Sequence, residues 1–215
     1  MIEAVVFDLD GVVIDSEPVW EEVRRGVVAE FGGTWMPDTQ KRLMGMSTPE
    51  WADYLAGELG VWLSPDETAA TVIERMAERY RHHLPLLPHA AATMRAVADQ
   101  WPIGVASSSP AVLIDTVLTA LDVDVRVAIS TETMKRGKPA PDVYLAVVER
   151  LGVTPGRCVA VEDSSNGLRS AAAAGLIVVA VPQEAYPPDE DALAGAALVL
   201  TDLAELTPEA VARLA

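Results

Sequence analysis

Acidic, hydroxyl and lysine side chains occupy places in this 215-residue sequence where the strands of a parallel sheet are expected to end. Each acid or hydroxyl follows directly on a short apolar run, and the lysine opens a later helical segment. The set consists of Asp8, Asp10, Ser107, Ser108, Lys138, Glu162 and Asp163. Ligands of open parallel sheets bind beyond the carboxyl ends of the strands. We therefore expect these side chains to converge on one edge of the sheet.

The acids of this set would repel one another strongly if they met. Two carboxylates about 4 Å apart cost roughly 4 kcal/mol at an effective dielectric constant of about 20. A divalent cation that prefers oxygen ligands relieves such repulsion, and Mg²⁺ suits a site of carboxylates completed by water. The sequence thus predicts a Mg²⁺ site formed by Asp8, Asp10, Glu162 and Asp163.

The combination of groups predicts phosphoryl transfer. One ionised carboxylate attacks phosphorus and forms an aspartyl-phosphate. A second carboxyl group, two residues further on, protonates the leaving oxygen and later deprotonates water. The hydroxyl, the lysine and helix N-terminal amides bind the phosphoryl oxygens. Each group alone has a more ordinary interpretation, since an Asp-x-Asp pair at a strand end is usually a turn or a helix cap. Their joint placement favours an enzyme.

Two other enzyme classes lack their motifs in this sequence. A serine hydrolase would pair Ser107 with His82, His83 or His89, but no Gly-x-Ser-x-Gly elbow is present. No Gly-x-x-x-x-Gly-Lys loop occurs either, which argues against a kinase or a nucleotide-driven motor. A binding protein that has lost turnover is the alternative from a different class, although a binder has no need of the full set.

The elements that must position these groups alternate along the chain. Apolar runs typical of strands covered on both faces lie at 2–8, 102–107, 125–129, 157–162 and 176–181. Helical patterns follow at 89–100, 110–121, 139–151 and 164–174, with Ser109 as the expected N-cap before Pro110. The alternation predicts an α/β fold with a doubly wound parallel sheet and helices on both faces.

The segment 15–84 does not fit this alternation. It has helical patterning without a convincing strand and is too long for an ordinary crossover. We interpret it as a small α-helical domain inserted after the first strand, which leaves 1–14 and 85–215 for the catalytic core. A few extra helices packed on the edge of the sheet are the alternative.

Four segments, taken in order, resemble the four motifs of the haloacid dehalogenase superfamily. They are Asp8-Leu9-Asp10-Gly11-Val12, Ser107, Lys138-Pro139-Ala140-Pro141-Asp142 and Glu162-Asp163-Ser164. The resemblance covers essentially the whole chain and is closest to the β-phosphoglucomutase and sugar-phosphatase branch. It implies a Rossmann-like core, a helical cap in the inserted segment, and hydrolysis of a phosphate monoester of a small metabolite such as a sugar or polyol phosphate.

The resemblance also implies the catalytic roles. Asp8 is then the nucleophile and Asp10 the general acid/base. The residues implied to bind the phosphoryl group are Ser107, Ser108 and Lys138.

The same resemblance implies how the metal is held. Mg²⁺ then binds Asp8, the backbone carbonyl of Asp10 and Asp163, with Glu162 in or beside the coordination shell. The residues expected to support this loop are Gly11, Asn166 and Gly167.

The inserted segment departs from the mutases of this branch. They typically carry a histidine shortly after the first motif and basic residues in a cap loop, whereas Trp20, Met44 and Thr48 stand at the aligned positions here. We therefore expect a phosphatase, with a phosphomutase as the alternative. The candidate substrate contacts are Trp20, Met44, Gly45 and Met46, although such residues at helical spacing are more often core.

Composition narrows the range of partners. The formal net charge of −16 repels polyanions, so we expect no nucleic-acid partner. Cys158 is the only cysteine, which excludes an internal disulfide. The N-terminal run reads as a strand, and the longest apolar stretch is too short to span a bilayer, so we expect a cytoplasmic protein without a membrane partner. We expect a monomer and leave a dimer open.

Overall fold

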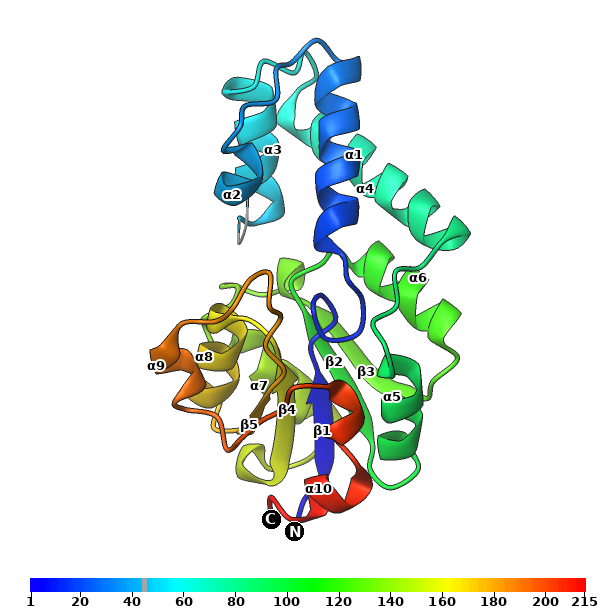
Figure 1. Ribbon diagram of the computed structural model, residues 1–215, viewed down its shortest axis with the longest axis vertical. Helices are drawn as coiled ribbons and strands as arrows, with labels where there is room; N and C mark the ends of the chain where they lie inside the picture. The colour runs from blue at the N-terminus through cyan, green and yellow to red at the C-terminus, as the bar shows by residue number, and fades with distance from the viewer. Residues whose placement is uncertain (44–45) are drawn as a thin grey trace. The chain divides into compact units, whose positions relative to one another are not determined.

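A computed structural model describes residues 1–43 and 46–215 of the chain (Figure 1). The chain divides into two compact units. The core unit comprises Met1–Asp15 and Pro85–Ala215, and the helical unit comprises Ser16–Leu84. The second unit starts one residue later than the inserted segment expected from the sequence.

The core unit is built on a parallel sheet, which has six strands in the described part of the chain. Their order is β3-β2-β1-β4-β5-β6. The strands are β1 (Ala4–Phe7), β2 (Ile103–Ser107), β3 (Val125–Ser130), β4 (Cys158–Glu162), β5 (Ile177–Ala180) and β6 (Leu198–Val199). The apolar runs expected to be strands are confirmed as β1 to β5. The two-residue strand β6 was not expected, because it is too short to produce a pattern of its own.

Helices cover both faces of the sheet (Figure 1). Those of the core unit are α5 (Ala90–Ala98), α6 (Ala111–Leu121), α7 (Asp142–Leu151), α8 (Ser165–Ala173), α9 (Glu190–Leu193) and α10 (Pro208–Ala212). Helix α5 packs on β2 and α6 on β3, while α7 contacts β1, β2 and β3, and α8 contacts β4 and β5. The chain builds outward from β1 to β3, and α7 then carries it back to β4 on the other side of β1. The predicted doubly wound fold is therefore confirmed, and its strand order reverses at β1 and β4, where ligands of such sheets bind.

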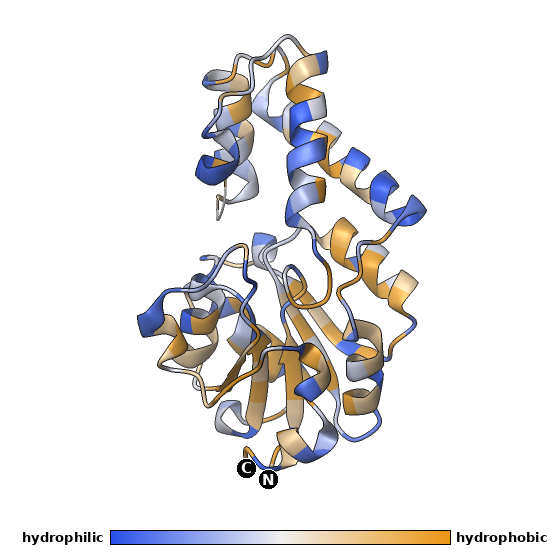
Figure 2. Cartoon of the chain, viewed as in Figure 1, coloured by the Kyte–Doolittle hydropathy of each residue, from blue (hydrophilic) through white to orange (hydrophobic). Residues whose placement is uncertain are grey.

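The strands of the sheet are coloured hydrophobic in Figure 2, and their buried side chains pack against those of the helices. Alternate residues of β1, Ala4 and Val6, belong to a buried cluster with Val147 of α7 and Leu168 of α8. Val5 and Phe7 are equally buried and point to the opposite face, because successive side chains of a strand alternate. Full burial of such a side chain contributes roughly 1.5–3 kcal/mol, so the strands form a rigid base for the loops at their carboxyl ends.

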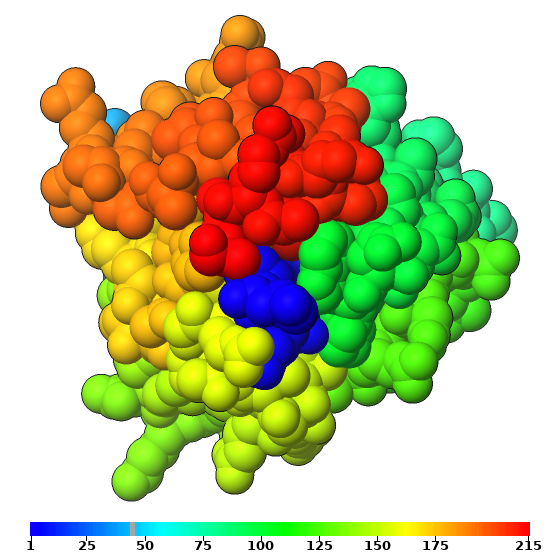
Figure 3. Space-filling view, turned by 90° about the horizontal axis from the view of Figure 1, so that it is seen from below, coloured from blue at the N-terminus to red at the C-terminus, as the bar shows by residue number. Residues whose placement is uncertain are grey.

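The two ends of the chain lie together at the amino edge of the sheet. Figure 3 shows the N-terminal segment beside the C-terminal one on this face. The first residues are fixed by Arg157, whose Nε donates to the Met1 carbonyl at 3.0 Å and whose guanidinium pairs with Glu3 at 2.6 Å. The carboxyl edge, where the polar residues of the motifs lie, is at the opposite end of the core unit.

In its described residues, the helical unit contains helices and no strand. They are α1 (Glu17–Glu30), α2 (Thr39–Leu43), α3 (Thr48–Gly57) and α4 (Pro65–His82). Helix α4 packs against both α1 and α3. Capping boxes start α3 at Ser47 and α4 at Ser64, each with a proline in the first turn, which defines where these helices begin. None of the described helices is both long and apolar enough to cross a membrane.

Candidate active site

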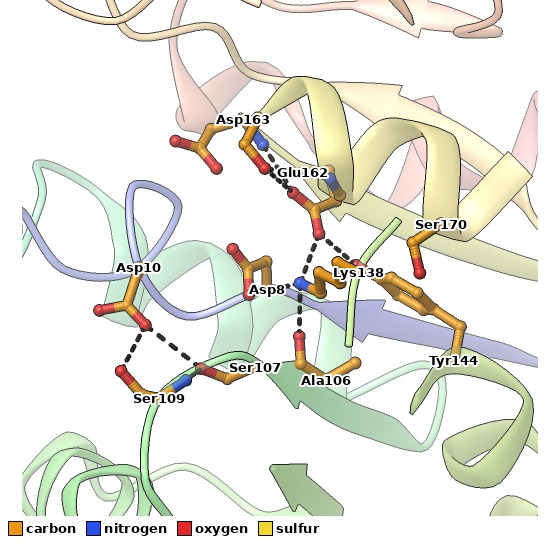
Figure 4. A network of polar contacts seen from close by, with 12 residues as sticks. Asp8, Asp10, Ala106, Ser107, Ser109, Lys138, Tyr144, Glu162, Asp163 and Ser170 are labelled. Carbon is orange, nitrogen blue, oxygen red and sulfur yellow. Dashed lines mark hydrogen bonds and ion pairs between the residues drawn. The ribbon is translucent and has the colours of Figure 1, made fainter. Parts of the chain in front are cut away.

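The loop after β1 places two aspartates at the carboxyl edge of the sheet (Figure 4). The backbone N–H of Asp8 donates to the Val161 carbonyl at 2.9 Å, which continues the pairing with β4 by one residue. The chain then turns at Gly11, whose φ of +77° favours glycine. A Cβ at Gly11 would overlap the Asp163 carboxylate, so glycine also allows the two loops to approach each other. This geometry explains the glycine that follows the Asp-x-Asp pair.

Lys138 lies between Asp8 and Glu162 at the centre of the site (Figure 4). Its Nζ donates to Asp8 Oδ1 at 2.9 Å, to Glu162 Oε1 at 2.6 Å and to the Ala106 carbonyl at 2.9 Å. The lysine side chain is only 6% exposed. An ammonium group has three donors, and all of them are used here. Lys138 is thus a buried cation that links β1, β2 and β4.

Glu162 is fully buried and hydrogen-bonded through both of its oxygens. Besides Lys138, Oε1 accepts from the Tyr144 hydroxyl at 2.7 Å. Oε2 accepts from the Asp163 N–H at 3.2 Å and from the Ser164 hydroxyl at 3.3 Å. A Cβ at Gly167 would overlap this carboxylate, so the helix that follows needs glycine at that position. Glu162 therefore anchors Lys138. The hydrogen bond from Tyr144 to Glu162 was not expected from the sequence.

Negative charge exceeds positive charge in this pocket. Burial, followed by the charge of Glu162, raises the pKa of Asp8 to about 8, and Lys138 offsets this only in part. Burial, Glu162 and Asp8 likewise raise the pKa of Asp163 well above its ordinary value. For Lys138, burial acts to lower the pKa, but the charges of Asp8 and Glu162 overcome it and raise the pKa. A single lysine does not balance the surrounding carboxylates, so the pocket favours an additional cation.

The donor set fits a hard divalent cation. One carboxylate oxygen from each of Asp8, Glu162 and Asp163 lies within 4.8 Å of the others. All are oxygen ligands, which Mg²⁺ prefers, and Asp163 is partly exposed, so water can complete the shell. Of these residues, Glu162 already has both oxygens engaged by protein donors. Asp8 and Asp163 are accordingly the more available ligands.

Asp10 lies on the side of the loop that faces the end of β2 (Figure 4). Its Oδ2 accepts from the hydroxyls of Ser107, at 3.2 Å, and Ser109, at 2.8 Å. Oδ1 is buried and has no hydrogen-bond partner within the described ranges. Ser109 was expected to cap the next helix, which is wrong: Pro110 is the N-cap of α6, and the Ser109 hydroxyl binds Asp10 instead.

Other expected site residues stand apart from this network. Ser108 and Asn166 are exposed. The side-chain amide of Gln183 donates to the Gly11 carbonyl at 2.7 Å. Gln183 was not among the site residues expected from the sequence. Ser108 and Asn166 therefore remain predictions as phosphate-binding and supporting residues.

The substrate contacts expected in the inserted segment belong to the helical unit. Met44 and Gly45 lie outside the described residues, and Met46 is half-buried. Trp20 is only 7% exposed, with its ring 6.1 Å from that of Trp51 and the Arg24 guanidinium 4.5 Å above it. Trp20 thus has a packing role within its own unit, and a role in substrate contact stays a prediction.

Comparisons with known proteins agree with this geometry. A model of the haloacid dehalogenase-like hydrolase family matches residues 2–175. Hexitol phosphatase B of Escherichia coli is 34% identical over 96% of this chain and 95% of its own length. A phosphorylated carbohydrates phosphatase of Thermotoga maritima is 32% identical over 81% of this chain and 82% of its own. The crystal structure of CbbY from Rhodobacter sphaeroides in complex with phosphate superposes with a TM-score of 0.85, at 26% identity and 96% coverage of both chains.

Proposed function

The chain belongs to the haloacid dehalogenase-like hydrolases, and we propose that it is a Mg²⁺-dependent phosphatase for a sugar or polyol phosphate, acting through a phosphorylated Asp8. The observation that carries this proposal is the placement of the Asp8 carboxylate against Lys138, with Asp10 held two residues further on. The names of the relatives, a hexitol phosphatase and a phosphorylated carbohydrates phosphatase, support the substrate class.

In the first half of the reaction, the Asp8 carboxylate attacks phosphorus. The Asp8 O–P bond forms, the bond from phosphorus to the sugar oxygen breaks, and the Asp10 carboxyl gives its proton to that oxygen. Ser107 donates its hydroxyl to a phosphoryl oxygen, and Lys138, which is held against Asp8, places its positive charge beside the phosphoryl group. In the second half, water attacks the phosphorus of the phospho-aspartate and loses a proton to Asp10. The Asp8 O–P bond breaks, which frees phosphate and restores the Asp8 carboxylate.

Mg²⁺ is proposed to lie among Asp8, Asp163 and Glu162, with the backbone carbonyl of Asp10 as the further ligand implied by the family. Bound there, it supplies positive charge that offsets the charge of the phosphoryl group. Lys138 supplies the other positive charge, from the side of β2.

Removal of divalent ions is expected to abolish hydrolysis of p-nitrophenyl phosphate. Mg²⁺ should restore it, whereas Ca²⁺ should inhibit, because Ca²⁺ takes more ligands at longer distances and would displace the nucleophile. Mg²⁺ should also raise the melting temperature of the parent protein but not that of Asp163→Asn. Asp124→Asn is the matched control, since this aspartate is 73% exposed at the start of β3. Undiminished turnover after EDTA treatment would contradict the metal requirement.

The enzyme is expected to release phosphate rather than move it within a sugar. A mutase must hold a second phosphate, but the segment 43–48 has no charged residue. The nearby arginines are engaged within the helical unit: Arg24 stacks on Trp20, Arg25 pairs with Glu21 at 3.0 Å, and Arg42 pairs with Asp38 at 3.1 Å. A second phosphate would have to compete for these cations.

The test is incubation with β-glucose 1-phosphate and a trace of the 1,6-bisphosphate. Inorganic phosphate should appear faster than glucose 6-phosphate. The reverse order would favour the phosphomutase instead.

A further inference from the structure

The hydroxyls that hold Asp10 differ in what else they must do. Ser107 and Ser109 both donate to Asp10 Oδ2, at 3.2 and 2.8 Å. In the proposed reaction Ser107 also binds the phosphoryl group. A hydroxyl has a single proton to donate, so Ser107 cannot serve Asp10 and the phosphoryl oxygen at once. When substrate is bound, Ser109 is left as the hydroxyl that holds Asp10.

The backbone of Ser109 is itself held in place by two hydrogen bonds. Its backbone N–H donates to Ser107 Oγ at 3.0 Å, and its carbonyl accepts from the Ser130 hydroxyl at 2.7 Å. Ser130 ends β3 and is 3% exposed, while Ser109 is 5% exposed. The hydroxyl of Ser109 does not cap helix α6. The loop after β2 is thus fixed to β3, and its serine points at Asp10.

We propose that Ser109 is the positioning residue of the general acid/base: by holding Oδ2 of Asp10 it leaves Oδ1 as the atom that gives the proton to the leaving oxygen and later takes it from water. This role rests on the proposed phosphatase function. Oδ1 of Asp10, unlike Oδ2, has no hydrogen-bond partner in the residues that the structure describes, so no protein donor competes for it. A carboxyl group free to rotate would present this atom in the wrong direction for part of the time, and small misplacements of a catalytic group are costly.

A pair of substrates separates proton transfer from binding. Phenyl phosphate and p-nitrophenyl phosphate bring the same ring to the site, but p-nitrophenolate leaves without a proton, whereas phenolate benefits from one. The ratio of kcat/KM for the two substrates reports on the first half of the reaction, which includes departure of the leaving group. We expect Ser109→Ala to lower kcat/KM about tenfold for phenyl phosphate and less than about twofold for p-nitrophenyl phosphate, a part of the roughly 10²–10⁴-fold contribution of an acid catalyst.

Ser109→Thr, which keeps the hydroxyl, should restore the phenyl phosphate reaction. Thr119→Ala should change the rate with neither substrate, since Thr119 is exposed on helix α6 and lies outside the site. If Ser109→Ala does not fold, as judged by its circular dichroism and melting temperature, Ser109→Cys replaces it, because a thiol is similar in size and only a weak donor.

Equal losses for both substrates, or no loss for either, would overturn the role of Ser109 while leaving the phosphatase function intact. A parent protein that hydrolyses neither substrate with Mg²⁺ would overturn the phosphatase function itself, and the role of Ser109 with it.

Discussion

Asp8→Asn is expected to abolish turnover and to leave the fold intact. An amide is a poor nucleophile, so the bond to phosphorus does not form. The substitution is nearly isosteric and removes one of the carboxylates that crowd the pocket with Glu162 and Asp163. The free energy of unfolding in EDTA should therefore be no lower than that of the parent protein.

The measurement is acid quenching of the enzyme with radiolabelled phenyl phosphate, followed by detection of label on the protein. The parent should carry label during turnover, and Asp8→Asn should carry none. Asp124→Asn, an exposed aspartate at the opposite edge of the sheet, should behave as the parent. Full activity of a purified Asp8→Asn protein would refute the assignment of Asp8 as the nucleophile.

Lys138→Met is expected to cause the largest loss of stability among substitutions at the site. The lysine donates to both Asp8 and Glu162 and is 6% exposed, so its removal leaves two buried carboxylates without their cation. Breaking a buried ion pair by removing one partner typically costs about 3–5 kcal/mol. Because Mg²⁺ supplies positive charge to the same pocket, it should recover part of this loss, but not the binding of the phosphoryl group.

Urea unfolding in EDTA and in Mg²⁺ measures both effects. Lys135→Met is the control, since this exposed lysine lies three residues away in the same loop. An unfolding free energy in EDTA equal to that of the parent would show that Lys138 does not stabilise the buried acids.

The sequence alone was sufficient for the sheet and for the edge at which the chemistry gathers. Strands β1 to β5 are apolar throughout because both of their faces are covered, and this pattern is local and easily read. Polar residues that follow such strands must meet at one edge, because parallel strands all end there. Asp8 and Glu162 were expected to meet on this ground, and in the structure Lys138 contacts both of them.

The contact of Ser109 with Asp10 could have been predicted from the spacing of the serines, but it was not. Ser107 and Ser109 are two residues apart, and side chains two apart on an extended segment point the same way, whereas Ser108 points elsewhere. The preference of serine before proline for helix capping then concealed the bond from Ser109 to Asp10.

Only the tertiary structure decided which distant residues complete the site. Tyr144 is a normal core residue of an amphipathic helix by its spacing, and only the packing of α7 directs its hydroxyl at Glu162. Gln183 reaches the Gly11 carbonyl across 172 positions of sequence, and Ser130 reaches Ser109 from a neighbouring strand. Such contacts depend on the order β3-β2-β1-β4-β5, which local patterns do not contain, because strand order follows from how the crossover helices pack on the two faces of the sheet.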